Sequence, residues 1–131
     1  MGRRELRENI FKLLFRVEFY ETDELPEQLI TFFDMAAEMI ESDEIYIKQK
    51  FNAMLEKLPE IDLAINKISE GWKTSRMCKV DLTLIRLAVY EIQYDQEVPT
   101  SVAINEAVEL AKKYGTDESP SFVNGVLAKL A

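Results

Sequence analysis

The 131-residue sequence contains no histidine and a single cysteine, Cys78. Histidine is the commonest general base and metal ligand in proteins, so its absence excludes Ser/His/Asp and Cys/His catalytic arrangements. One cysteine excludes an internal disulfide and a metal site built from several thiolates. We therefore expect a protein that is not an enzyme, binds no metal and uses no cofactor.

Glycine, proline and long apolar runs are also scarce. The four glycines and four prolines are scattered, and the isolated glycines form no phosphate-binding loop. No apolar run is long enough to span a membrane, and the N-terminal arginines are not followed by the apolar stretch of a signal peptide. We expect a cytoplasmic protein with one domain over residues 1–131 and no membrane partner.

The net charge is −8, and it is unevenly distributed. Residues 1–16 carry five basic and two acidic side chains (+3), and residues 17–70 carry four basic and fourteen acidic ones (−10). Residues 71–131 carry seven basic and eight acidic side chains (−1). The acidic middle argues against indiscriminate coating of nucleic acid, whereas an oriented contact through the basic N-terminus is compatible with this pattern.

Apolar residues recur at helical spacing along the whole chain, and no segment shows the two-residue alternation of a strand. The pattern predicts an all-α bundle of about seven short helices. They cover about residues 3–20, Pro26 to Ile40, Ser42 to Leu58, a short segment after Pro59, about residues 80–94, and two helices on either side of Gly115.

Three local features define these helices more closely. Pro59 lacks the backbone N–H that a helix interior needs, so it is expected to interrupt the third helix. Ser119 is expected to cap the last helix, with Pro120 at its first position. The apolar face of the second helix is predicted to contain Leu29, Ile30, Phe33, Ala36, Ala37 and Ile40.

The helix over residues 80–94 is apolar on almost every side, unlike the others. Such a helix either lies at the centre of the core or is partly covered by a partner. Both interpretations can hold together if its N-terminal end is exposed while the rest is buried.

Two aromatic residues lie beside the apolar stripe of the first helix, among arginines. On a helical projection, Phe11 and Phe15 flank the stripe together with Arg4 and Arg7. Arginine neutralises phosphate and aromatic rings stack on unpaired bases, so this combination suits RNA. The alternative is that both phenylalanines extend the core and the arginines are solvated.

The last helix repeats this theme. Phe122 lies in its first turn, close to free backbone N–H groups that attract anions. Lys112, Lys113 and Tyr114 end the preceding helix a short turn away. The alternative is that Phe122 packs inward and the lysines complement the helix dipole.

Several strings, in this order and spacing, resemble those of the NusB family of transcription antitermination factors. They are RRELRE at residues 3–8, Trp72 with Arg76, LIRLA at 84–88 followed by YE at 90–91, VAINEA at 102–107 and FVNGVL at 122–127.

The resemblance implies an all-α fold of two packed helical subdomains. It implies binding to the boxA RNA element of ribosomal RNA leaders, in a heterodimer with NusE, a small-subunit ribosomal protein. The pair would join other Nus factors on elongating RNA polymerase. Relatives include monomers and homodimers, so a homodimer of this chain is compatible with the resemblance.

The resemblance also implies site residues. Those for partner contact with NusE are Asp81 and Leu84. Those for RNA contact are Arg3, Arg4, Arg7, Phe15, Lys112, Tyr114 and Phe122.

Two other functions fit the same residues. One is a protein-only adaptor that uses an apolar helix face and binds no RNA. The other is the helical RNA-binding domain that relatives share with ribosomal RNA cytosine methyltransferases, but no cofactor-binding βαβ segment follows it here, so we do not expect methyltransferase activity. Salt dependence separates RNA binding from an apolar protein interface, because only contacts with phosphates weaken steeply as salt rises.

Overall fold

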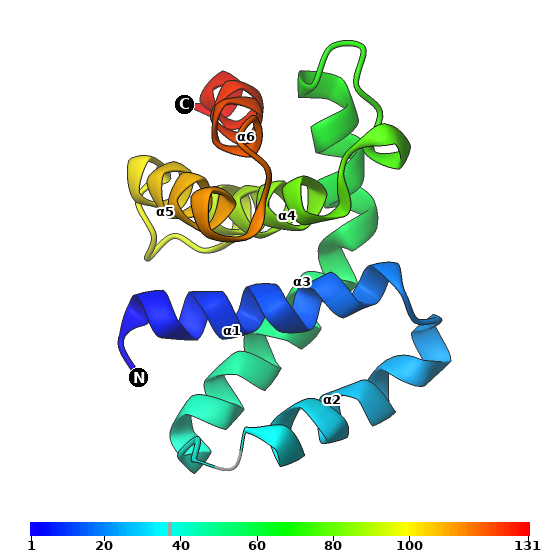
Figure 1. The fold of residues 1–131 in the computed structure, drawn as a ribbon, viewed down its shortest axis with the longest axis vertical. Helices are drawn as coiled ribbons and strands as arrows, with labels where there is room; N and C mark the ends of the chain where they lie inside the picture. Colours follow the sequence, from blue (N-terminus) through cyan, green and yellow to red (C-terminus); the bar gives the residue numbers. More distant parts are fainter. Residues whose placement is uncertain (37) are drawn as a thin grey trace. The chain divides into compact units, whose positions relative to one another are not determined.

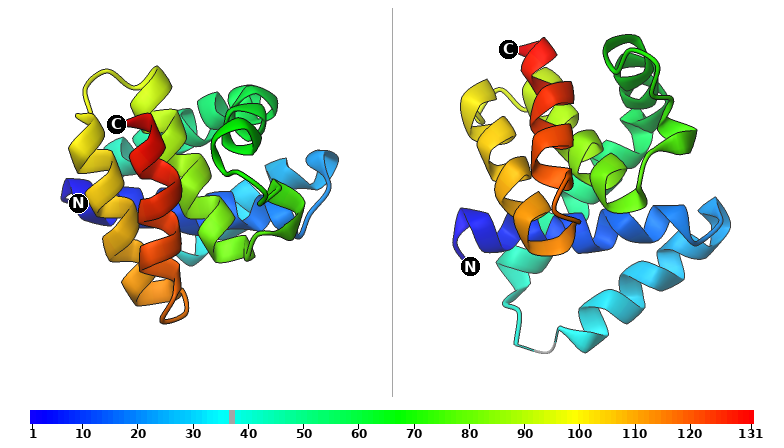
Figure 2. Two further views of the ribbon diagram at one scale, coloured as in Figure 1. Left: turned by 90° about the horizontal axis from the view of Figure 1, so that it is seen from above. Right: turned by 45° about the horizontal axis from the view of Figure 1, so that its top comes forward.

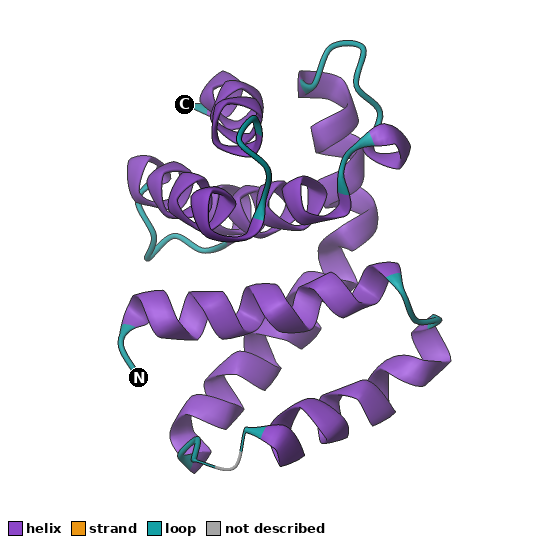
Figure 3. Cartoon of the chain, viewed as in Figure 1, coloured by secondary structure: helices purple, strands orange, loops and turns teal. Residues whose placement is uncertain are grey.

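The computed structural model describes residues 1–36 and 38–131, so Ala37, one of the residues predicted for the second apolar face, lies outside the described residues. The described residues form helices and loops without a strand (Figure 3). The six α-helices are α1 (Arg3–Phe15), α2 (Leu25–Met35), α3 (Glu41–Ile68), α4 (Lys79–Tyr94), α5 (Thr100–Tyr114) and α6 (Ser119–Leu127). Short 3₁₀ turns are η1 (Arg16–Glu18), η2 (Thr22–Glu24), η3 (Thr74–Arg76) and η4 (Ala128–Leu130). The all-α prediction is confirmed.

The chain forms two compact units, and the division between them falls inside α3 (Figure 1). Unit 1 (Met1–Leu55) holds α1, α2 and the first part of α3. Unit 2 (Glu56–Ala131) holds the rest of α3 with α4, α5 and α6. Among the described residues, no helix combines the length and the apolar character that crossing a membrane requires.

The predicted interruption at Pro59 is wrong, because α3 continues through this residue. Proline in a helix interior removes one backbone hydrogen bond, here the one to the Leu55 carbonyl, at a cost of about 3 kcal/mol. Met54 and Ile61 on either side of it are fully buried. Burial of this apolar stripe outweighs the local cost, and one 28-residue helix replaces the third and fourth predicted helices.

The core of unit 1 is formed by α1 with parts of α2 and α3. Its buried residues include Ile10, Phe11, Leu13, Leu14, Leu25, Phe32, Ile47, Phe51 and Met54. On α2 the buried residues are therefore Leu25 and Phe32, whereas Ile30 is 64% exposed. The predicted apolar face of this helix is wrong, because α2 ends at Met35 and turns a different side toward the core.

Helix α1 ends at Phe15 rather than near residue 20, and η1 continues the chain as a tighter turn. Arg16 holds this turn against α2. Its guanidinium donates a hydrogen bond of 2.8 Å to the Gln28 side-chain oxygen and lies 5.4 Å from the centre of the Phe32 ring. The end of α1 is thereby fixed by a polar and a cation–π contact together.

Helix α4 lies at the centre of unit 2. Its residues Leu84, Ile85 and Val89 are fully buried, and α5 and α6 pack beside it (Figure 2). Arg86 is a buried cation on this helix, and its guanidinium donates two hydrogen bonds of 2.8 Å to the two carboxylate oxygens of Asp62 on α3. The central-core interpretation of the fifth predicted helix is confirmed.

The turn between α5 and α6 depends on close packing at Gly115. The Ser119 hydroxyl accepts a hydrogen bond of 3.0 Å from the Thr116 backbone N–H. Helix α6 begins at Ser119 with Pro120 second and Glu118 at the N-cap position, so the prediction of Ser119 as the cap is wrong. A Cβ on Gly115 would overlap the Ser119 side chain and lie 2.9 Å from the Ala111 carbonyl oxygen. Glycine is needed here because space is lacking.

Replacing Gly115 with alanine should therefore destabilise the protein by about 1–3 kcal/mol, because the turn must shift to admit a methyl group. Gly125→Ala is the matched control, since a Cβ at that helical site would meet no described atom within 4 Å apart from its chain neighbours and its own helix backbone. The control should stabilise α6 by about 0.5–1 kcal/mol. Urea unfolding followed by circular dichroism measures both, and equal effects of the two substitutions would contradict this account of the turn.

Candidate nucleic-acid interface

The predicted RNA-binding residues of unit 1 all lie on α1. Arg3 and Arg4 occupy its first turn and are exposed. Arg7, one turn later, is only 9% exposed. The two outer guanidiniums are therefore accessible to a phosphate, whereas Arg7 presents little surface in this conformation.

Three phenylalanines form a row from the core of unit 1 to its surface. The rings of Phe11 and Phe15 lie 6.1 Å apart, and those of Phe15 and Phe19 lie 5.0 Å apart in an edge-to-face arrangement. Phe11 is 3% exposed, Phe15 is half-buried and Phe19 is 55% exposed. The core interpretation thus holds for Phe11, while Phe15 keeps accessible surface.

Sequence reasoning missed Phe19 as a neighbour of Phe15. The predicted helix over about residues 3–20 would also place Phe19 one turn beyond Phe15. The helical projection nevertheless named only the residues that flank the apolar stripe, and Phe19 was not among them. The signal was the regular spacing of Phe11, Phe15 and Phe19 along the chain.

The predicted residues of unit 2 flank the turn between α5 and α6. Lys112 is exposed and its ammonium lies 3.1 Å from a Glu109 carboxylate oxygen. The Lys113 ammonium lies 5.4 Å from the centre of the Tyr114 ring. Tyr114 and Phe122 are both half-buried, so each ring has one packed part and one accessible part.

Phe122 does not pack into the core but against Trp72, which precedes α4. Their ring centres lie 5.8 Å apart with an angle of 74° between the planes. Trp72 itself is 54% exposed. The structure therefore adds an accessible aromatic ring to the predicted set, and the only sequence signal for it was the spacing of Trp72 and Arg76.

The two residues predicted to contact a partner differ in accessibility. Leu84 is fully buried in the core of unit 2, so in this conformation it has no surface for a partner to touch. Asp81 is 7% exposed, and among the described residues its Oδ1 atom has no hydrogen-bond partner. An unsatisfied buried carboxylate oxygen is costly and favours an incoming donor.

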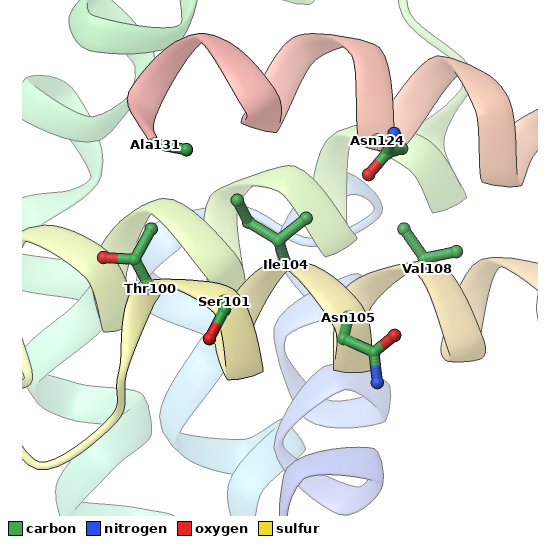
Figure 4. A pocket seen from close by; sticks show the side chains of 7 residues that line it. All are labelled: Thr100, Ser101, Ile104, Asn105, Val108, Asn124 and Ala131. Atoms are coloured by element: carbon green, nitrogen blue, oxygen red, sulfur yellow. The ribbon is translucent and has the colours of Figure 1, made fainter.

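A hollow of about 570 Å³ lies between α5 and α6 on another part of unit 2 (Figure 4). Ile104 and Val108 point into it from α5, and Asn124 faces them from α6. Its lining contains no charged side chain and none of the predicted site residues. Within the described residues, no group of three or more histidine, cysteine, aspartate or glutamate side chains could hold a metal ion.

Comparison with curated proteins gives matches along the whole chain. The transcription antitermination protein NusB of Agathobacter rectalis is 55% identical over 131 residues, which cover 100% of both chains. The protein of the same name from Lachnoclostridium phytofermentans is 53% identical and covers 99% of this chain and 98% of its own.

Solved structures agree with these sequence matches. NusB of T. maritima superposes with a TM-score of 0.89 at 34% identity, covering 100% of this chain and 91% of that one. A chain in a structure described as a plectonemic RNA supercoil gives a TM-score of 0.83 at 25% identity, covering 96% of this chain and 91% of that one. The NusB family model matches residues 4–131. The chain therefore belongs to the NusB family.

Proposed function

We propose that this protein is a non-catalytic transcription antitermination factor that binds boxA-like RNA together with NusE. The heterodimer of this protein and NusE, with its bound RNA, would then join other Nus factors on elongating RNA polymerase. The observation that carries this proposal is the end-to-end match to proteins named for transcription antitermination. A solved structure of similar fold whose description names RNA adds support for an RNA ligand.

The accessible side chains supply two kinds of contact that RNA requires. Arg3 and Arg4 would bind phosphates, and Phe15, Tyr114 and Phe122 would stack on unpaired bases. Lys112 and, after a local adjustment, Arg7 would add further phosphate contacts. Because the chain as a whole carries −8, binding depends on these few positions and not on its overall charge.

Asp81 supports the proposed contact with NusE. Its unsatisfied Oδ1 lies in the first turn of α4, where a donor from a partner protein would replace the water it loses on burial. We place the contact at Asp81 and the exposed residues before it, since Leu84 lies beneath the surface.

A boxA-containing RNA should bind better than a scrambled RNA, and NusE should strengthen the difference. Contact with about four phosphates gives a slope near −3 of log affinity against log salt, or roughly 60-fold weaker binding between about 50 and 200 mM salt. Fluorescence anisotropy of labelled RNA, with and without NusE, measures this. If NusE is captured but no RNA is selected under any condition, the protein is an adaptor and the RNA-binding proposal fails.

Phe122→Ala should weaken boxA binding by about 1–3 kcal/mol, the usual effect of losing one stacked base, with the helical content unchanged. Phe33→Ala is the matched control, because Phe33 is likewise half-buried and packs edge-to-face, on Phe32 at 5.2 Å. Anisotropy and circular dichroism are measured for both variants. Equal RNA affinities of the two variants would remove Phe122 from the site.

Asp81→Asn should weaken NusE binding by about 1.5–3 kcal/mol, the typical contribution of a hydrogen bond to a charged group. The free protein should not lose stability, because Oδ1 makes no hydrogen bond in it. Asp34→Asn, an exposed aspartate on α2, controls for the change of charge. Calorimetric titration with NusE provides the measurement, and wild-type affinity of Asp81→Asn would place the partner elsewhere.

A further inference from the structure

More than half of the Trp72 side chain is accessible to a ligand. It is the only tryptophan of the chain, it lies in the loop between α3 and α4, and it is 54% exposed. Its ring packs edge-to-face with Phe122, which is itself half-buried. Two accessible rings from distant parts of unit 2 thus lie side by side.

The backbone that carries Trp72 is held by a dense set of local bonds. Glu70 and Gly71 both adopt positive φ angles of 29° and 83°, which turn the chain sharply after α3. The Trp72 N–H donates to the Ser69 carbonyl at 3.3 Å, and the Ser69 hydroxyl donates to the Trp72 carbonyl. The indole is therefore positioned by its loop before any ligand binds.

Two contacts tie this loop to the neighbouring helices. The Thr74 N–H donates to the Asn66 side-chain oxygen on α3 at 2.9 Å. The Lys129 ammonium, beyond α6, lies 3.4 Å from a Glu70 carboxylate oxygen. The loop and the end of the chain are thus linked near the helix that carries Phe122.

The same loop is basic, in contrast to the chain as a whole. Residues 71–80 contain Lys73, Arg76 and Lys79 and no acidic residue, although the net charge of the protein is −8. Lys73 and Arg76 are exposed. Cations beside accessible aromatic rings match single-stranded RNA, which presents phosphates and base faces together, better than they match an apolar protein surface.

We propose that Trp72 is an additional base-stacking residue of the RNA site, with Lys73 and Arg76 binding the adjoining phosphates. This inference rests on the proposed RNA-binding function and extends the unit 2 site from the turn between α5 and α6 to the loop before α4. A base would stack on the free face of the indole, while Phe122 supports the ring from its edge.

Because Trp72 is the only tryptophan, its fluorescence reports on this site without any modification. Addition of boxA RNA should quench the emission of the wild-type protein along the same titration curve that anisotropy of labelled RNA gives. RNA binding by anisotropy with unchanged Trp72 emission would overturn this inference and leave the proposed function intact. Absence of RNA binding by anisotropy would instead overturn the proposed function.

Substitutions of Trp72 test whether its ring stacks on an RNA base or only supports the ring of Phe122. Trp72→Ala should weaken RNA binding about 5-fold to 150-fold, and Trp72→Phe should retain most of the affinity. Tyr46→Ala is the control, because Tyr46 is 44% exposed and also lies beside a lysine, Lys50 at 5.8 Å, but on α3 in unit 1. Circular dichroism should show an unchanged helical content for all three.

A double-mutant cycle with Phe122→Ala completes the test. If Trp72 stacks on its own base, Trp72→Ala should weaken binding further in the Phe122→Ala background. If it only supports Phe122, the second substitution should have no added effect, and the inference fails. Loss of NusE capture by Trp72→Ala with wild-type RNA affinity would likewise overturn it and assign Trp72 to the protein partner.

Discussion

Burial of α4 on almost every side is the constraint on which unit 2 depends. A helix with so little polar surface is stable only when other helices cover it, and α5 and α6 pack against it while α3 contributes Asp62. Its buried cation, Arg86, is 8% exposed and would be costly there without the two hydrogen bonds to Asp62. The loop before α4 carries Trp72, the end of α5 carries Tyr114 and the first turn of α6 carries Phe122, so packing on α4 determines where the candidate RNA contacts of unit 2 lie.

The proposed function requires an acidic chain to bind a polyanion through a few local contacts. Exposed arginines begin α1, and the loop before α4 combines exposed Lys73 and Arg76 with the accessible ring of Trp72. Such an arrangement provides little long-range electrostatic attraction. It relies on stacking contacts, which require a ligand with unpaired bases. Selectivity rather than strength is the property that this charge distribution favours.

Periodicity in the sequence was sufficient to predict the all-α fold and the position of most helices, since the spacing of buried residues follows directly from helix geometry. It failed where packing between distant residues overrides a local preference. Pro59 normally ends a helix, but the buried residues on both sides keep α3 continuous. Ser119 is a typical cap, but its hydroxyl bonds backward to Thr116 instead.

The candidate site was predictable to a similar extent. The exposure of Arg3 and Arg4 follows from their place at the start of an amphipathic helix, whereas the burial of Leu84 required knowing what covers α4. The contact of Trp72 with Phe122 joins a loop to a helix far along the chain, and no local pattern encodes such a pair.

Helix α3 belongs to both units, and this has a consequence for folding. Its residues Ile47 and Phe51 are buried in unit 1, and Ile61 and Ile65 are buried in unit 2. Each core includes part of α3, so partial unfolding of one unit should also destabilise the part of α3 that belongs to the other unit. Pro59, next to the boundary, interrupts the ladder of backbone hydrogen bonds at one place and so weakens this transmission. We therefore expect the two units to unfold with incomplete coupling, and amide hydrogen exchange in α3 should change in rate from one side of Pro59 to the other.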